Sequence, residues 1–208
     1  MEDVLDVYTQ PYDPRRPQVC MDETSKQLLS DLRQPLPVQA GQPERIDYEY
    51  QREGIADLFM FFEPLAAKRF VKVTDQRTRK DWAQAMKELA DEKYPQADKI
   101  VMIMDNLNTH SPASFYETFE PEEAQRLTKR FEFHYTPKHG SWLNMAEIEL
   151  GVIIRQCLSR RIADKNTLET EVNAWQNDRN AKVGKVDWLF TTADARIKLK
   201  HLYPVIHV

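Results

Sequence analysis

Two acidic residues follow short apolar runs, at positions where α/β proteins often carry out chemistry. Asp105 comes directly after Ile100–Met104, five apolar residues without a break, and a polar turn that begins with Asn106 follows it. Such a run is typical of a strand buried on both faces, and catalytic groups usually lie at the carboxyl ends of such strands. Asp22 follows the short strand-like piece 18–21 (QVCM) in the same way, before a predicted turn. Taken alone, an acid at such a position is more often a helix cap or a turn residue.

A third acid, Glu147, stands in the first turn of a helix that we predict from Asn144 to about Arg161. At about 100° per residue, the apolar side chains of this helix share one arc. The arc contains Leu143, Ala146, Leu150, Ile153, Ile154, Cys157 and Leu158. Glu147 lies at the edge of the arc. Glu149 lies about 200° around the helix from Glu147, so we expect it to point toward solvent. Asn144 and Glu147 also have the spacing of a capping box, so a capping role stays open.

Three carboxylates that begin or end core elements have the chemistry of a metal site. Asp22, Asp105 and Glu147 would present hard oxygen ligands, which Mg²⁺ and Mn²⁺ prefer. Two such ions about 4 Å apart can hold the attacking and the leaving oxygen of a phosphodiester. The three acids therefore predict metal-dependent cutting and joining of DNA strands, without a covalent protein intermediate.

The elements that must position these acids alternate between strands and helices. Strands are predicted at 18–21, 55–62, 69–73, 100–104 and 131–135, and helices at 78–93, 144–161 and 164–180, with short helical stretches from Pro112, Pro121 and Ala193. Residues 55–62 and 69–73 are separated by a short turn, so we expect antiparallel neighbours. The order predicts an α/β fold whose sheet starts antiparallel and gains parallel strands. Residues 1–17 are expected to be an N-terminal tail or linker, before a domain at 18–204.

The composition excludes several classes of protein. The chain has 208 residues, a net charge of −4 and a sequence pI of about 5.8, which argues against a simple basic nucleic-acid-binding module. Its apolar runs are too short to span a membrane, and its acidic start lacks the apolar segment of a secretory signal. Cys20 and Cys157 are expected to be reduced core thiols of a cytoplasmic protein rather than a disulfide. No cysteine or histidine pair has the spacing of zinc ligands.

Three segments resemble the catalytic domain of bacterial DDE transposases: CMDETSKQL, DNLNTH and HYTPKHGSWLNMAEIEL. The resemblance is to the insertion-sequence 630 family, which is related to mariner-like elements, and it runs from about Val19 to Pro204. It implies an RNase H-like fold, with a mixed central sheet flanked by helices. It also implies strand cleavage and strand transfer that depend on two Mg²⁺ or Mn²⁺ ions. The acidic triad of the family corresponds to Asp22, Asp105 and Glu147, which would be both the catalytic residues and the metal ligands.

The same segments contain polar residues that are candidates for supporting metal or contacting DNA: Asn106, His110, Lys138 and Asn144. The implied partners are transposon ends and target DNA, with a homodimer in the active complex and no membrane. Members usually carry N-terminal helix-turn-helix domains that bind the ends. This chain starts almost at the first strand, so we expect those domains to be missing, as in a fragment, a split-frame product or a domesticated remnant. The alternatives are a catalytically silent remnant that pairs with a full-length transposase, and another RNase H-like nuclease.

Overall fold

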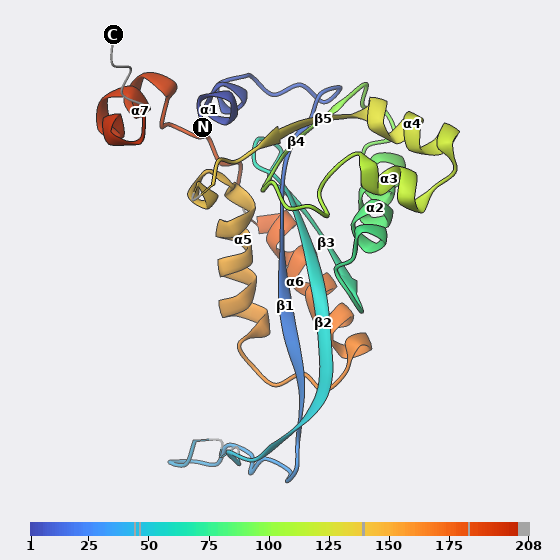
Figure 1. Ribbon diagram of the computed structural model, residues 1–208. Helices are drawn as coiled ribbons and strands as arrows, with labels where there is room; N and C mark the ends of the chain where they lie inside the picture. The colour runs from blue at the N-terminus through green and yellow to red at the C-terminus, as the bar shows by residue number, and fades with distance from the viewer. Residues whose placement is uncertain (44, 46, 139, 183, 204–208) are drawn as a thin grey trace.

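A five-stranded sheet in the order β3-β2-β1-β4-β5 forms the centre of the computed structural model (Figure 1). The structure describes residues 1–43, 45, 47–138, 140–182 and 184–203. His139 of the third motif and Pro204, the predicted end of the domain, lie outside the described residues.

The sheet has an antiparallel half and a parallel half. The strands β1 (Gln18–Asp31), β2 (Tyr50–Glu63) and β3 (Lys68–Thr74) are antiparallel neighbours. The strands β4 (Ile100–Met104) and β5 (Phe131–Tyr135) continue the sheet in parallel with β1. The predicted α/β fold with parallel additions is confirmed, and all five residues of β4 are buried, as its unbroken apolar sequence predicts.

Strand β1 is much longer than the prediction, which ended it at residue 21. Its second half is polar, yet it pairs with β2 as far as Asp31 and Tyr50, with one register shift between Leu28 and Leu29. Pairing to a neighbouring strand imposes extended backbone where the side-chain pattern favoured a turn. Asp22 therefore lies inside a strand and not at its end. Figure 1 shows β1 and β2 running beyond the helices as a two-stranded arm.

Helices cover both faces of the sheet. One face packs against α2 (Arg79–Glu88), its π-helical continuation η1 (Leu89–Lys93), α3 (Ala113–Thr118) and α4 (Pro121–Arg130). The predicted apolar stripe of α2 and η1 is buried in this core: Trp82, Ala85, Met86, Leu89 and Ala90. Thr78 caps α2 with a capping box that includes Asp81. The predicted helices on this face are therefore confirmed.

The other face packs against α5 (Met145–Ile153), its π-helical continuation η3 (Ile154–Leu158) and α6 (Lys165–Lys182). The predicted apolar arc of α5 and η3 is buried apart from Ile154, which is 43% exposed where the π-helical turn begins. The remaining short elements are η2 (Ser141–Leu143), α7 (Thr192–Lys198) and η4 (Lys200–Leu202). No helix in the described part of the chain is long and apolar enough to cross a membrane.

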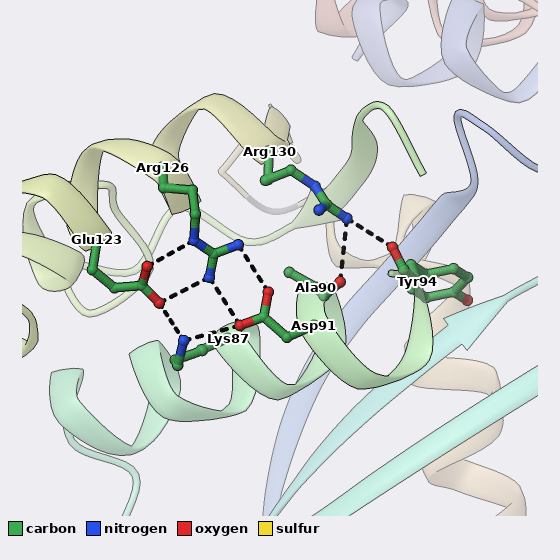
Figure 2. A network of polar contacts seen from close by, with 7 residues as sticks. All are labelled: Lys87, Ala90, Asp91, Tyr94, Glu123, Arg126 and Arg130. Carbon is green, nitrogen blue, oxygen red and sulfur yellow. Dashed lines mark hydrogen bonds and ion pairs between the residues drawn. The ribbon is translucent and has the colours of Figure 1, made fainter. Parts of the chain in front are cut away.

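A charged network fixes α4 against α2 and η1 (Figure 2). The guanidinium of Arg126 donates to both carboxylate oxygens of Asp91, at 2.9 and 2.8 Å, and also to Glu123. Arg130 donates to the carbonyls of Ala90 and Tyr94, at 3.2 and 2.7 Å. Ala90 is the second residue of η1 and Tyr94 directly follows its end, so Arg130 joins the last residue of α4 to both ends of the π-helical turn.

The first residues form helix α1 (Glu2–Tyr8) and not a tail. Val4 and Leu5 are fully buried in the core that also contains residues of α5 and α7. The hydroxyl of Tyr8 donates to the carbonyl of Leu143 (2.7 Å) and lies 3.2 Å from the sulfur of Cys20. The prediction of a tail is therefore wrong for residues 2–8, because apolar side chains of this acidic segment complete a core made by distant parts of the chain. Cys20 and Cys157 are both buried and free, as predicted.

Side-chain amides of α6 cover the outer edge of β3. Asn180 accepts from the backbone N–H of Arg69 and donates to its carbonyl, at 2.9 Å in each case. Gln176 accepts from the backbone N–H of Val71 at 2.7 Å. The two amides lie one helical turn apart, so they meet alternate residues of the edge strand. In this way α6 satisfies backbone groups that an edge strand would otherwise present to solvent.

Candidate active site

Asp22 and Asp105 meet because of the register between β1 and β4. The parallel pairing ends with Cys20 opposite Ile103, and each acid lies two residues further along its chain. Neighbouring strands are about 4.8 Å apart, so the two carboxylates emerge beside each other. Asp105 follows the end of β4 as predicted, and its side chain is 42% exposed. The structure therefore brings the two predicted acids together, although Asp22 stands in mid-strand.

Asn144 holds the first turn of α5, which carries Glu147, against β1. Its side-chain amide donates to the carbonyl of Met21 at 2.8 Å, and its side-chain oxygen accepts from the N–H of Ala146 at 3.1 Å. Asn144 is only 3% exposed, so these bonds are shielded from water. Glu147 itself is exposed. The cap of α5 is thus made by Asn144, which ties the helix turn that carries Glu147 to the strand that carries Asp22.

Two of the predicted acids act electrostatically on the third, Asp22. Burial raises the pKa of Asp22, the N–H of Glu23 opposes this by donating to its carboxylate at 2.8 Å, and the charges of Asp105 and Glu147 raise it again. The resulting pKa is about 6. The charges of Asp105, after β4, and of Glu147, on α5, therefore both act on Asp22.

His110 links Asp105 to a fourth acid, Glu23. Its Nδ1 lies 2.6 Å from Asp105, and its Nε2 lies 3.0 Å from Glu23. The ring is 1% exposed and stacks on Trp82, with 5.9 Å between centroids. Burial would lower the pKa of His110, but the hydrogen bonds to the two acids outweigh it and raise the pKa to about 9. A protonated His110 donates from both nitrogens, so it orients Asp105.

Sequence reasoning missed Glu23 as part of the site. The residue directly follows Asp22, and alternation along a strand turns its side chain to the opposite face of β1. There its carboxylate faces His110 and lies 3.7 Å from Arg77. The adjacent acids Asp22 and Glu23 could have indicated a fourth acid at the site. That interpretation requires β1 to continue past Asp22, because only in a strand do neighbouring side chains point to opposite faces.

The two remaining candidates, Asn106 and Lys138, lie beside the acids and not among them. Both are exposed, and both line an open hollow together with Asp105. The other residues of its wall are Leu107, Tyr135, Thr136, Pro137 and Ser141. The structure thus brings Asn106 and Lys138 to the approach of the site, whereas His110 and Asn144 support its acids from the protein side.

The donor set fits a divalent cation. Among the described residues, no three acidic, histidine or cysteine side chains are gathered as ready metal ligands. Asp22 nevertheless carries a raised pKa because it is partly buried among other acids, and a cation between these groups would relieve that repulsion. Carboxylate oxygens are also the ligands that Mg²⁺ and Mn²⁺ prefer. The residues that would hold the cation are Asp22, Asp105 and Glu147.

Glu149 is buried, against the prediction that it points to solvent. It is 2% exposed, and its Oε2 lies 2.6 Å from Nε of Arg179 and 3.0 Å from Nε of Arg69. Burial would raise the pKa of Glu149, but the hydrogen bonds to Arg179 and Arg69 outweigh it and lower the pKa. The prediction failed because β3 and α6 pack on the side of α5 that a helical wheel assigns to solvent. Glu149 therefore anchors α5 and lies outside the acidic site.

The sequence also matches a family model, which is described as the DDE superfamily endonuclease and covers residues 17–169. The chain belongs to the DDE superfamily of endonucleases. The matched range contains all three acids of the site, and it extends from the start of β1 into α6. The DDE superfamily assignment and the geometry of the site therefore concern the same residues.

Solved structures of the Mos1 mariner transposase share the fold of this DDE superfamily member. The Mos1 paired-end complex with Mg matches with a TM-score of 0.58 at 15% identity, over 89% of this chain and 54% of that chain. The paired-end complex with Mn matches with a TM-score of 0.56 at 15% identity, over 84% and 52%. The predicted RNase H-like fold is confirmed. The chain spans about half the length of these Mos1 chains, and a search of curated proteins gives no significant match.

Proposed function

We propose that this chain is the catalytic domain of a DDE transposase of the insertion-sequence 630 type, which cleaves DNA at transposon ends and transfers the strands to target DNA. The proposal is carried by the register of β1 and β4, in which Asp22 and Asp105 each lie two residues beyond the paired Cys20 and Ile103, and by Asn144, which bonds the first turn of α5, with Glu147, to β1. The superfamily match and the fold shared with Mos1 support it. Structures of Mos1 as a paired-end complex and as a strand transfer complex lend further support.

The cofactor in this proposal is a pair of Mg²⁺ or Mn²⁺ ions. Asp22 and Asp105 would hold the first ion, and Glu147 would complete the second site. Mos1 complexes contain Mg or Mn, which supports either ion here. When bound, such ions make water or a strand-end hydroxyl a better nucleophile and stabilise the charge on the leaving oxygen.

The side chains around the acids keep them in place and receive the DNA. His110 holds one oxygen of Asp105, so the carboxylate keeps a fixed orientation. Asn144 fixes the turn of α5 that carries Glu147. Lys138 and Asn106 line the hollow next to Asp105, where a cation and an amide can contact phosphates on both sides of the reacting bond. We further propose that two copies act together on two ends and that end recognition needs residues outside this domain.

Nicking of supercoiled plasmid DNA tests this function, because it requires no knowledge of the transposon end. The full chain is incubated with plasmid at low salt and millimolar Mn²⁺ or Mg²⁺, and conversion to nicked circles is measured. We expect the wild type to nick and Asp22→Asn, Asp105→Asn and Glu147→Gln to lose activity by orders of magnitude, because each removes a ligand charge. Glu122→Gln is the matched control, since it removes an exposed acid from the first turn of another helix, α4.

The outcomes separate the proposal from its alternatives. Equal nicking by the wild type and the three site variants would refute it. Cleavage of an RNA–DNA hybrid with no nicking of DNA would indicate another RNase H-like nuclease. Metal binding without any nicking, by protein that is folded, would indicate a catalytically silent remnant.

A further inference from the structure

The turn η2, between β5 and α5, places a large aromatic side chain at the surface. Trp142 is 42% exposed, although its neighbour Leu143 is fully buried. The turn has little freedom to hide it. The N–H of Gly140 donates to the carbonyl of Pro137 at 2.8 Å, and a Cβ at Gly140 would lie only 2.6 Å from the ring of Pro137. The tight turn and the buried Leu143 therefore hold the backbone of Trp142 at the surface.

Two aromatic residues from the segment before α7 pack against the ring of Trp142. Trp188 stacks on it with 6.4 Å between centroids and 24° between planes, and Phe190 meets it edge-on at 5.9 Å. Trp188 is itself fixed, because its indole N–H donates to the carbonyl of Phe190 at 2.7 Å and its ring packs 5.0 Å from Tyr8. We call Trp142, Trp188 and Phe190 the aromatic platform.

One lysine lies over a ring of the aromatic platform, and two more are close to its residues along the chain. Lys198 lies over the ring of Phe190, with 5.6 Å from Nζ to the centroid, and its side chain is 65% exposed. Lys185 precedes Trp188 by three residues and is 63% exposed, next to Asp187. Lys138 is exposed in the same loop as Trp142. Aromatic rings interleaved with cations are the combination that binds single-stranded nucleic acid, since bases stack on the rings and phosphates meet the cations.

The aromatic platform adjoins the acidic site along the chain. Ser141 lines the hollow beside Asp105, and Trp142 is the next residue. Glu147 follows in the first turn of α5. One loop therefore carries Lys138 at the hollow and Trp142 on the platform, and leads directly to the third acid.

We propose that Trp142 stacks on an unpaired base of the DNA strand that enters the acidic site. This inference rests on the proposed function, because it takes DNA as the substrate, and it adds the recognition of a strand end that has left its duplex. An exposed indole backed by further aromatic rings offers a flat face to any base. The platform therefore selects unpaired over paired DNA without reading sequence.

Two DNA probes test the inference, with Ca²⁺ in place of Mg²⁺ so that binding is measured without cleavage. One is a blunt duplex, and the other is the same duplex with a short single-stranded overhang that carries 2-aminopurine. Affinity is measured by anisotropy, and stacking by quenching of the 2-aminopurine. We expect Trp142→Ala to weaken overhang binding about tenfold or more and to abolish quenching, while blunt-duplex binding stays unchanged. Trp142→Phe should keep most of both signals.

Tyr116→Ala is the matched control, because Tyr116 is an aromatic side chain on α3 that is 51% exposed; it should change neither signal. Equal losses on both probes, or no loss with Trp142→Ala, would overturn the inference. So would a change of oligomeric state in Trp142→Ala without a change in overhang binding, which would make the platform a contact between copies. Selective loss on the overhang in a protein that never nicks DNA would uphold the inference and refute the proposed cleavage.

Discussion

The environment of Asp22 makes stability depend on pH. Its pKa is about 6 in the folded protein, compared with 3.8 for a free aspartate. Below about pH 4 the group is neutral in both the folded and the unfolded protein. As the pH rises toward 6 and beyond, the unfolded chain releases the proton more readily than the folded one, so the contribution of this group to stability is lost.

Asp22→Asn should therefore stabilise the metal-free protein at about pH 7.5 but not below about pH 4. The expected gain in the free energy of unfolding is on the order of 2 kcal/mol, because asparagine has no charge to bury among acids. Urea unfolding with a chelator, at both pH values, measures it. Asp187→Asn, at an exposed site, is the control. A gain of the same size at both pH values would show that charge is not the cause.

The residues of the site differ in how far sequence could predict them. The motifs around Asp105 and Glu147 resemble those of a known family, so the triad could be chosen without a structure. The ion pairs of Glu149 could not, because its partners Arg69 and Arg179 come from β3 and α6, 80 and 30 residues away. A helical wheel considers one helix against one core, and α5 is packed on more than one side.

At the scale of elements, Glu149 joins α5 to β3 and α6. Glu149→Gln should lower the free energy of unfolding by about 3–5 kcal/mol, because it leaves the fully buried guanidinium of Arg69 without its charged partner. Chemical denaturation measures the loss. The control is Glu147→Gln, which lies two residues away and is exposed, and which should cost little stability. If the two variants were equally stable, the ion pairs of Glu149 would not anchor the helix.

Asn144 joins the same helix to β1 at the acidic site. Asn144→Ala should cost about 1–3 kcal/mol, because the carbonyl of Met21 and the N–H of Ala146 lose their partners in a buried place. Asn144→Asp keeps the acceptor for Ala146 but not the donor to Met21. We expect Asp to preserve the helix cap and still weaken Mn²⁺ binding, measured by calorimetry. Full metal affinity in both variants would show that the link to β1 does not position Glu147.

Among the elements, those with a clear apolar period were predictable and β1 was not. The apolar stripe of α2 and the apolar run of β4 can be recognised in the sequence, and each predicts the burial of its element. The second half of β1 has no such pattern, because residues 23–27 are polar and partly exposed. Its extended form comes from pairing with β2, whose residues are distant in sequence: Ser25 pairs with Asp57, more than 30 residues away.

For the molecule as a whole, the first residues are part of the core. Leu5→Ala should lower the free energy of unfolding by about 2–5 kcal/mol, because Leu5 is fully buried and its removal leaves a cavity. Leu189→Ala, at a leucine that is 85% exposed, should change it by less than about 0.5 kcal/mol. Thermal or urea unfolding compares the two. Similar stability of the two variants would mean that α1 contributes no more than the tail we predicted.

The strand sequence and the alternation with helices were enough to predict an α/β sheet that starts antiparallel, and the family resemblance supplied the RNase H-like order. Neither could place α1. Its sequence is short and acidic. Val4 and Leu5 are buried only in the folded protein, in a core that includes residues of α5 and α7, more than 100 residues away.

The amides of Asn180 and Gln176 along β3 also bear on how copies of this chain can meet. Backbone groups that already hold hydrogen bonds cannot pair with a strand from another molecule, so the part of β3 from Arg69 to Val71 resists intermolecular sheet extension for as long as α6 stays docked. Loss of α6, by proteolysis or truncation, would expose these backbone groups, so that the edge strand could pair with a strand of another molecule and cause aggregation. Soluble expression of shortened forms should therefore depend on whether the cut falls before or after this helix.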